Sequence, residues 1–427
     1  MHDAALGSRR ITLLVWWGLW VACVILLSIM FPLHGEGRIN VPHGQYIYFA
    51  ITLAVLIGFG VSLWQGNTEL PPVNYLIFLL ILFVSLLPSA VGGMNPLYSL
   101  RLITILLITT LPFILMGNLA SSHAAAGFLG AFLFVSFVSA LGALVLQWYG
   151  PVRLGAVELS NHLHGGWRWA FLFNQSTDLA ATMALGVSTV LYLLVVTSRL
   201  TVRCLLLFLV LPLLLFVYWK TDSRGGVVWV LWALFVFGIA GLVSLYRRLG
   251  SPKWYWDAVL LVTLVAVGIG YLVVSDAIYH FLRLGGADIT AGRQHVWWLY
   301  WDEFLAHPFI GFGFGGNAEF MADKPGISPF NVYFGLLGET GLIGAVPLFV
   351  FWLVGLSKAL WVALLEWGID RRRAGLALWV LAVLGGLALQ QNGEWSILRI
   401  APVNYLFFFT MSIAWSLDKY QIGNDKA

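Results

Sequence analysis

The sequence predicts an all-α polytopic membrane protein with about twelve transmembrane helices and one large outer loop that contains amphipathic helices. Of its 427 residues, 60% are hydrophobic and only 10% are charged, whereas a soluble domain carries about 25% charged residues. The mean hydropathy is +0.88. Apolar runs of about 20 residues, the length with which a helix crosses the hydrocarbon core of a bilayer, recur along the whole chain.

Twelve of these runs are predicted to span the membrane. The first is long enough for a span and too long for the core of a cleavable signal peptide. The seventh and the last are short, which indicates tilted helices or misplaced boundaries. The predicted spans lie near residues 11–31, 46–64, 75–92, 102–120, 125–149, 177–196, 204–219, 225–246, 258–274, 341–361, 374–390 and 403–417.

The distribution of basic residues predicts that both termini lie in the cytoplasm. With this orientation the cytoplasmic side holds 13 basic and 7 acidic residues, and the opposite side holds 10 basic and 12 acidic residues. Such a bias follows the positive-inside rule. The net charge of +4 therefore reports topology and not nucleic-acid binding. Two cysteines, Cys23 and Cys204, lie in apolar runs and are predicted to be buried small hydrophobic residues.

Two loops on the outer side are long. One covers residues 150–176, and the longer one covers residues 275–340. Loops of this length in a compact protein are usually functional or disordered, and the second is too rich in aromatic and glycine residues for disorder. Because no repeat or low-complexity linker interrupts the chain, residues 1–427 are predicted to form one membrane domain.

Several arginines lie on the predicted outer side, where the positive-inside rule disfavours them. A guanidinium group is a planar, permanently charged fork that matches phosphate oxygens, so several of them can hold a pyrophosphate whose lipid tail stays in the bilayer. The alternative is that each arginine reaches lipid headgroups or pairs with a nearby acid. The arginines are Arg101, Arg153, Arg168, Arg224, Arg283, Arg293 and Arg399.

Two of these arginines have a context that favours a ligand. Arg224 lies in "KTDSRGGVVW", where a span begins, and Arg293 opens the segment "GRQHVWWLYWDEFLAHPFIGFGFGG". The segment is amphipathic: an apolar face fits the membrane interface and leaves Arg293, Asp302 and Glu303 toward an aqueous cavity. The glycines then allow a sharp turn. A plain interfacial anchor helix is the alternative. The apolar face comprises Val296, Trp297, Tyr300, Trp301 and Phe304.

Three motifs in this order resemble those of the O-antigen ligase and polymerase superfamily. "RWAFLFNQSTDLAATMALG" resembles an element that precedes a span, and "TDSRGGVVW" resembles a Ser-Arg-Gly element at the start of the next span. "GRQHVWWLYWDEFLAHPFIGFGFG" followed by "NVYFGLLGETGLIG" resembles the core motif. The resemblance covers roughly residues 150–345, and the N-terminal spans share only their apolar character.

The resemblance implies a glycosyltransferase of the bacterial inner membrane with a periplasmic active site. Such enzymes transfer a glycan from undecaprenyl diphosphate to a sugar hydroxyl of lipid A-core or of a growing polysaccharide, without a metal or other cofactor. It implies that Arg224 and Arg293 stabilise the diphosphate. Expected partners are the lipid-linked donor, the glycan acceptor and membrane lipid, with no nucleic acid. Substrate contacts are expected at Arg153, Arg168, Asn174, Asn331 and Glu339.

The chain departs from the ligase pattern at one position. Ligases of the family carry His-Asn before the final motif helix, and this histidine is proposed to activate the acceptor hydroxyl. Here the pair is Phe330-Asn331, and phenylalanine cannot take a proton. His295, close to Arg293, is the preferred replacement, and His162 and His164 form a poor metal site on spacing alone. The other candidates are His307, Glu319, Asp323 and Glu339, of which His307 and Glu339 are interpreted as more structural.

Other functions stay open. A polymerase of O-antigen or exopolysaccharide repeat units is the closest alternative to a ligase, followed by a protein O-oligosaccharyltransferase and an inactive homologue. A flippase or transporter would explain the number of spans, but it predicts charges inside spans and broken helices in matched halves. No nucleotide-binding glycine loop, Asp-x-Asp or Walker motif is present in the sequence, which favours a lipid-linked donor over a nucleotide sugar.

Overall fold

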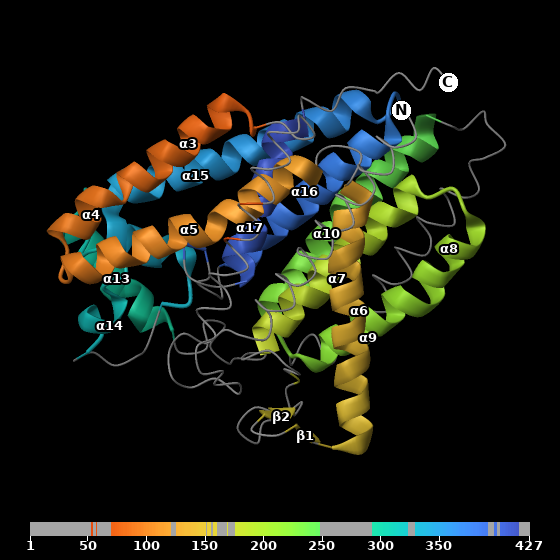
Figure 1. The fold of residues 1–427 in the computed structure, drawn as a ribbon, viewed down its shortest axis with the longest axis horizontal. Helices are drawn as coiled ribbons and strands as arrows, with labels where there is room; N and C mark the ends of the chain where they lie inside the picture. The colour runs from red at the N-terminus through yellow and green to blue at the C-terminus, as the bar shows by residue number, and fades with distance from the viewer. Residues whose placement is uncertain are drawn as a thin grey trace.

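The computed structural model describes a bundle of long helices (Figure 1). The described residues are 53, 57, 70–120, 125–150, 152–154, 157–159, 169, 176–247, 293–322, 329–391, 397–398 and 402–417. Apart from turns and connecting segments, these residues form helices and one hairpin, in which β1 (Val152–Leu154) pairs antiparallel with β2 (Val157–Leu159).

Among the described residues, eight helical stretches are long and apolar enough to cross a membrane, which confirms a polytopic membrane protein. The helices are α3 (Val73–Ser85) with α4 (Leu87–Gly92), α5 (Pro96–Ala120), α6 (Ala125–Tyr149), α7 (Ser176–Val196), α8 (Leu200–Leu205) with α9 (Leu211–Lys220), α10 (Arg224–Arg247), α15 (Val332–Glu366) and α16 (Arg371–Gln390).

Every predicted span that falls within the described residues coincides with a helix. The last of them, α17 (Pro402–Ser416), has 15 residues and therefore a length of about 22 Å, short of the roughly 30 Å hydrocarbon core. The spans predicted near 11–31, 46–64 and 258–274 lie outside the described residues, apart from Leu53 and Ile57. The count of twelve therefore stays a prediction.

The short seventh span becomes a full one because α8 and α9 are continuous. A π-helical turn, Leu206–Val210, joins them into a stretch of 21 residues from Leu200 to Lys220. The turn lies just before Pro212, whose ring nitrogen has no hydrogen to donate to the preceding turn, so the local hydrogen-bond pattern changes there. Cys204 is exposed on α8, and its predicted burial is wrong, because this side of the apolar helix faces out of the bundle.

The core lies around α7 and α16, which are buried along most of their length. α16 packs against α7, α10, α15 and α17, and the indole of Trp379 donates a hydrogen bond to Thr189 Oγ1 at 3.1 Å. Close approach of α10 to α16 requires glycine, because a Cβ at Gly386 would lie 2.0 Å from Trp229 Cδ1. Small residues at helix crossings are the usual way in which membrane helices gain packing contacts.

The crossing of α10 and α16 gives a first prediction. Gly386→Ala is expected to lower the free energy of unfolding of the detergent-purified protein by about 1–3 kcal/mol, and its melting temperature with it. The reason is that the buried indole of Trp229 must move to admit the methyl group. Gly238→Ala on α10 is the matched control, since nothing lies within 4 Å of its Cβ position. Equal melting temperatures for the two variants would contradict this account of the crossing.

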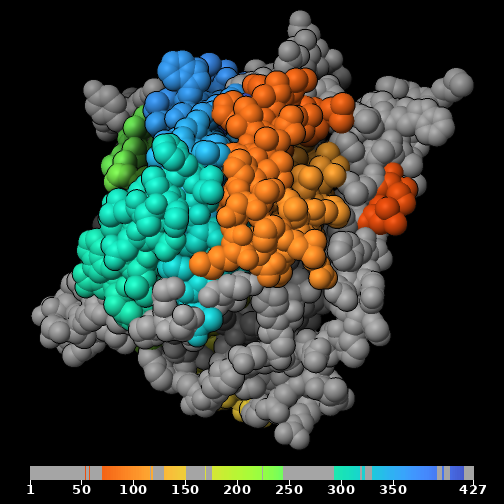
Figure 2. Space-filling model, turned by 90° about the vertical axis from the view of Figure 1, so that its left-hand side faces the viewer, coloured from red at the N-terminus to blue at the C-terminus, as the bar shows by residue number. Residues whose placement is uncertain are grey.

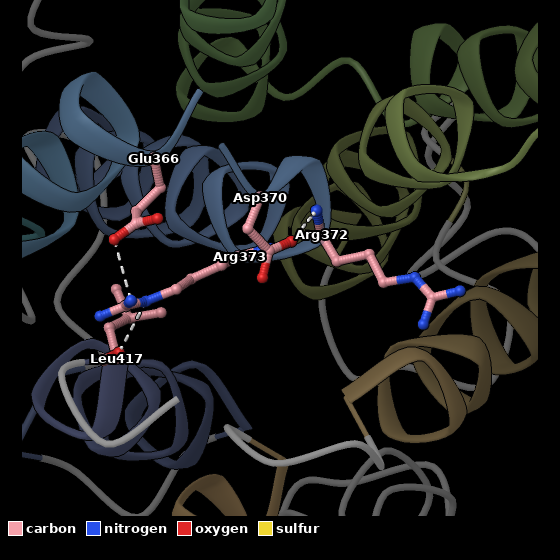
Figure 3. A network of polar contacts seen from close by, with 5 residues as sticks. All are labelled: Glu366, Asp370, Arg372, Arg373 and Leu417. Carbon is pink, nitrogen blue, oxygen red and sulfur yellow. Dashed lines mark hydrogen bonds and ion pairs between the residues drawn. The ribbon is translucent and has the colours of Figure 1, made fainter. Parts of the chain in front are cut away.

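One end of the bundle is closed by an arginine network (Figure 3). Arg373 Nη1 lies 2.9 Å from Glu366 Oε1, and Arg373 Nε donates to the carbonyl of Leu417 at 3.0 Å. Asp370 caps α16 by accepting from the backbone N–H groups of Arg372 and Arg373. These contacts connect the end of α15 with the start of α16 and with the end of α17. This end is called the arginine end below.

Candidate functional site

The other end of the bundle contains the predicted site and is called the loop end. There α9 ends at Lys220, α10 begins at Arg224, α15 begins after Asn331, and α16 ends at Gln390. The small hairpin β1–β2, the helix α13 (Gln294–Ala306) and the short helix α14 (Asn317–Phe320) lie outside the row of long helices (Figure 1).

α15 is broken close to this end. Gly341 has φ 56° and ψ −161°, a conformation outside the helical region and open in practice only to glycine. Such a break frees backbone groups on both sides of it, and buried groups of this kind must find other partners. The predicted span at 341–361 is therefore the second half of a longer helix, whose first half, from Val332, belongs to the region expected as loop.

The glycine-rich segment 307–316 supplies the missing partners. Phe312 N donates to Gly338 O at 2.9 Å and Gly313 N to Glu339 O at 3.0 Å, on one side of the break. On the other side, the N–H groups of Leu342 and Ile343 donate to the carbonyls of Pro308 and Phe309 at 2.8 and 3.1 Å. The two halves of the core motif are thus complementary backbone surfaces that hold each other.

The carboxylate of Glu339 is fully buried in this assembly. Its Oε2 accepts from Gly315 N at 3.1 Å, while its carbonyl also accepts from Ser89 Oγ at 2.8 Å. The same segment contacts the turn between α4 and α5 through Met94 N, which donates to Phe312 O. Figure 2 shows the α13 region directly beside α4 and α5 on one face. These contacts support the structural interpretation of Glu339, and its substrate contact stays a prediction.

The apolar face of α13 packs on protein. Val296 and Tyr300 are buried in a small cluster with Phe312, Phe320 and Met321, and Trp297 stacks on Phe334 of α15 with ring centroids 5.7 Å apart. The expectation that this face lies on the membrane interface is therefore corrected, because the start of α15 and the glycine-rich segment cover it.

Arg293 lies directly before α13, and its guanidinium carbon is 3.9 Å from the centroid of the Phe330 ring. The phenylalanine ring is thus a platform for the arginine, in a cation–π contact. Phe330 has φ +46°, a left-handed conformation that costs a non-glycine residue about 1–2 kcal/mol. The indole of Trp297 fixes the approach to this turn by donating to Pro329 O at 2.6 Å.

Asn331 follows as the N-cap of α15. Its Oδ1 accepts from Tyr333 N at 2.9 Å and from Phe334 N at 3.3 Å, and the residue is 3% exposed. Asparagine is among the preferred N-cap residues for this reason. Helix capping accounts for the amide oxygen at this position, and a substrate contact by Asn331 stays a prediction.

Arg224 begins α10, and the structure describes its backbone. A short path of contacts connects it with Arg293. The ring of Phe330 contacts Arg293, and Val332 follows Phe330 two residues later in the chain. The N–H of Val332 donates to Gln391 O at 3.0 Å. The neighbouring Gln390 side chain lies against α10, since a Cβ at Gly225 would be 3.1 Å from its Cγ. The starts of α10 and of α13 therefore belong to one end of the bundle.

The electrostatics of the two positions point to an anion. Arg224 and Arg293 each stand at the N-terminus of a helix, where the helix dipole is positive and a cation is unfavourable. Neither arginine therefore helps its own helix. An anion placed there would be attracted both by the guanidinium groups and by the positive ends of the two helix dipoles.

The remaining predicted residues are distributed around this end. His295 is exposed on α13, and His307 Nε2, at the end of that helix, lies 3.5 Å from Glu303 Oε1. The backbone of Arg153 lies opposite that of Glu158 in the register of β1 and β2, and Glu319 belongs to α14. Arg168, Asn174, His162, His164, Asp323, Arg283 and Arg399 lie outside the described residues.

Two residues of the loop end were missed in the sequence. Gln390 is 1% exposed at the end of α16, and its Oε1 has no hydrogen-bond partner within the described chain. Asp178 lies in the first turn of α7. Asp178 and Gln390 each lie at the end of a predicted span, and this position was the signal that could have identified them. The sequence alone did not show that α7 packs against α16. Across the described residues no group of three or more His, Cys, Asp or Glu side chains is placed to hold a metal ion.

A scan against models of protein families and a search of curated proteins each find no match for this chain.

Proposed function

We propose that the chain is an integral membrane glycosyltransferase of the bacterial inner membrane. It transfers a glycan from undecaprenyl diphosphate to a sugar hydroxyl of lipid A-core or of a growing polysaccharide, at the periplasmic end of the bundle. One observation carries the proposal: Arg224 and Arg293, both at helix N-termini, belong to helix starts that one short path of contacts joins. The motif order in the sequence supports the same reaction.

In the proposed reaction the acceptor oxygen attacks the anomeric carbon and undecaprenyl diphosphate departs. Negative charge builds on the departing diphosphate, and fixed cations in a site screened from water lower the barrier. Arg224 and Arg293 supply this charge, so that no metal is needed. The arginine end, with Arg371, Arg372 and Arg373, then faces the cytoplasm under the positive-inside rule.

A repeat-unit polymerase is the second candidate, because Phe330 replaces the histidine of ligases and supports Arg293 instead. A flippase or transporter fits less well. Transporters use the free backbone groups of broken helices to hold ions or substrate, whereas the freed groups beside Gly341 are bonded to segment 307–316.

A deletion strain tests the proposal. Complete polymer that stays on undecaprenyl diphosphate without transfer to lipid A-core is the expected result for a ligase, and accumulation of single lipid-linked repeat units is the expected result for a polymerase. Loss of all lipid-linked glycan from the periplasmic leaflet would contradict a transferase and indicate a flippase.

A further inference from the structure

We propose that the Asp178 carboxylate accepts the proton of the incoming sugar hydroxyl, at a junction of α7, α10 and α16 beside the start of α10. The inference rests on the proposed function and assigns within it the base that Phe330 cannot be. It concerns a side chain within "RWAFLFNQSTDLAATMALG" that is not among the predicted site residues.

The register of two helices brings Asp178 to this junction. α7 and α16 pack side by side and run in opposite directions, because Gly375 contacts Val196 whereas Trp379, farther along α16, bonds to Thr189. Asp178 precedes Thr189 by eleven residues, and Gln390 follows Trp379 by eleven residues. Eleven residues are just over three helical turns, so both side chains return to the facing surfaces of their helices at the same level.

The start of α10 completes the junction. A Cβ at Gly225 would lie 3.1 Å from Gln390 Cγ, and a Cβ at Gly226 would lie 3.2 Å from Ala180 Cβ. The first turn of α10 therefore contacts α16 at Gln390 and α7 at Ala180, in the same first turns of α7 that contain Asp178. Arg224, the proposed diphosphate ligand, is the residue directly before these glycines.

Two polar groups in this junction lack protein partners among the described residues. The Oε1 atom of Gln390 is buried and accepts no hydrogen bond there, which is costly for an amide oxygen unless a ligand supplies a donor. Asp178 is half-buried, and the structure records no hydrogen bond or ion pair to its carboxylate within the described chain. An ionisable residue of this kind at the edge of a span is rare unless it has a function.

The chemistry fits an acidic residue in the first turn of a helix. In its ionised form the carboxylate can accept a proton. As the acceptor O–H bond breaks, its proton passes to Asp178 and its oxygen bonds to the anomeric carbon. The bond from that carbon to the diphosphate breaks with its electron pair on the leaving oxygen, and Gln390 accepts a hydrogen bond from a sugar hydroxyl.

The test uses the purified full-length protein in nanodiscs, with undecaprenyl-diphosphate-linked glycan as donor and a glycan acceptor. Asp178→Asn is expected to lower kcat about 10³-fold, the usual effect of losing a general base, while the donor KM stays within about threefold. Asp178→Glu should recover part of the loss. Glu366→Gln, which alters a carboxylate at the arginine end, should keep wild-type kcat.

A second variant separates catalysis from stability. In Asp178→Gly the base is removed, and added formate, a small carboxylate, is expected to restore measurable turnover, whereas formate should not help Arg293→Ala. Wild-type kcat in Asp178→Asn, folded protein without rescue in Asp178→Gly, or loss of folded protein in all Asp178 variants overturns the inference alone. Absence of donor consumption by the wild-type protein overturns the proposed function and this inference with it.

Discussion

Replacement of Arg293 by alanine is expected to reduce the kcat of glycan transfer by at least about 10²-fold, the typical loss when one fixed group that stabilises developing negative charge is removed. The structure gives the physical reason. The guanidinium is held 3.9 Å from the Phe330 ring centroid at the N-terminus of α13, where in the proposed reaction its charge stabilises the departing diphosphate. Arg224→Ala should cause a loss of similar size, and turnover is measured with the purified variants.

The control variants separate charge from geometry. Arg293→Lys keeps the charge but loses the planar fork that can contact two phosphate oxygens, so an intermediate kcat is expected. Arg373→Gln removes an arginine at the arginine end and breaks its pairing with Glu366, so stability falls while transfer continues. Wild-type turnover in either Arg224→Ala or Arg293→Ala would remove these residues from the site.

Substitution of Gly341 or Gly311 by alanine is expected to destabilise the loop end by about 3 kcal/mol or more. A Cβ at Gly341, whose φ is +56°, would lie 2.3 Å from the carbonyl carbon of Phe309. A Cβ at Gly311 would lie 2.2 Å from Gly338 O. Either methyl group separates segment 307–316 from the break in α15 and exposes unpaired backbone groups.

The measurement is the melting temperature and the yield of monodisperse protein after detergent extraction. Gly130→Ala on α6 is the matched control, since nothing lies within 4 Å of its Cβ position. A protein that tolerates Gly341→Ala with an unchanged melting temperature would show that the two halves of the core motif do not depend on one another as described.

The sequence predicted the helices well, because apolar runs of membrane length leave few alternatives to a helix when no water is present to satisfy the backbone. It did not predict that "HPFIGFGFGG" and "GETGLIG" bond to one another, since this pairing depends on the φ of Gly341 and on contacts between segments distant in the chain.

The contacts of single aromatic residues were the hardest to foresee. Phe330 was interpreted as the loss of a base, and only its left-handed backbone turn brings its ring to Arg293. The apolar face of α13 was assigned to the membrane because an amphipathic pattern does not specify what covers it. The junction of Asp178 and Gln390 needed the relative register of α7 and α16, which hydropathy does not contain.

Binding of undecaprenyl diphosphate tests the central claim most directly, that Arg224 and Arg293 hold one diphosphate together. The dissociation constant is measured for the purified wild-type protein, Arg224→Ala, Arg293→Ala, the double variant and Arg373→Gln. We expect each single alanine variant to lose at least about tenfold in affinity, the double variant to lose less than the product of the two because the groups share one ligand, and Arg373→Gln to bind as wild type does. Wild-type affinity in either alanine variant, or an equal loss in Arg373→Gln, would contradict the claim.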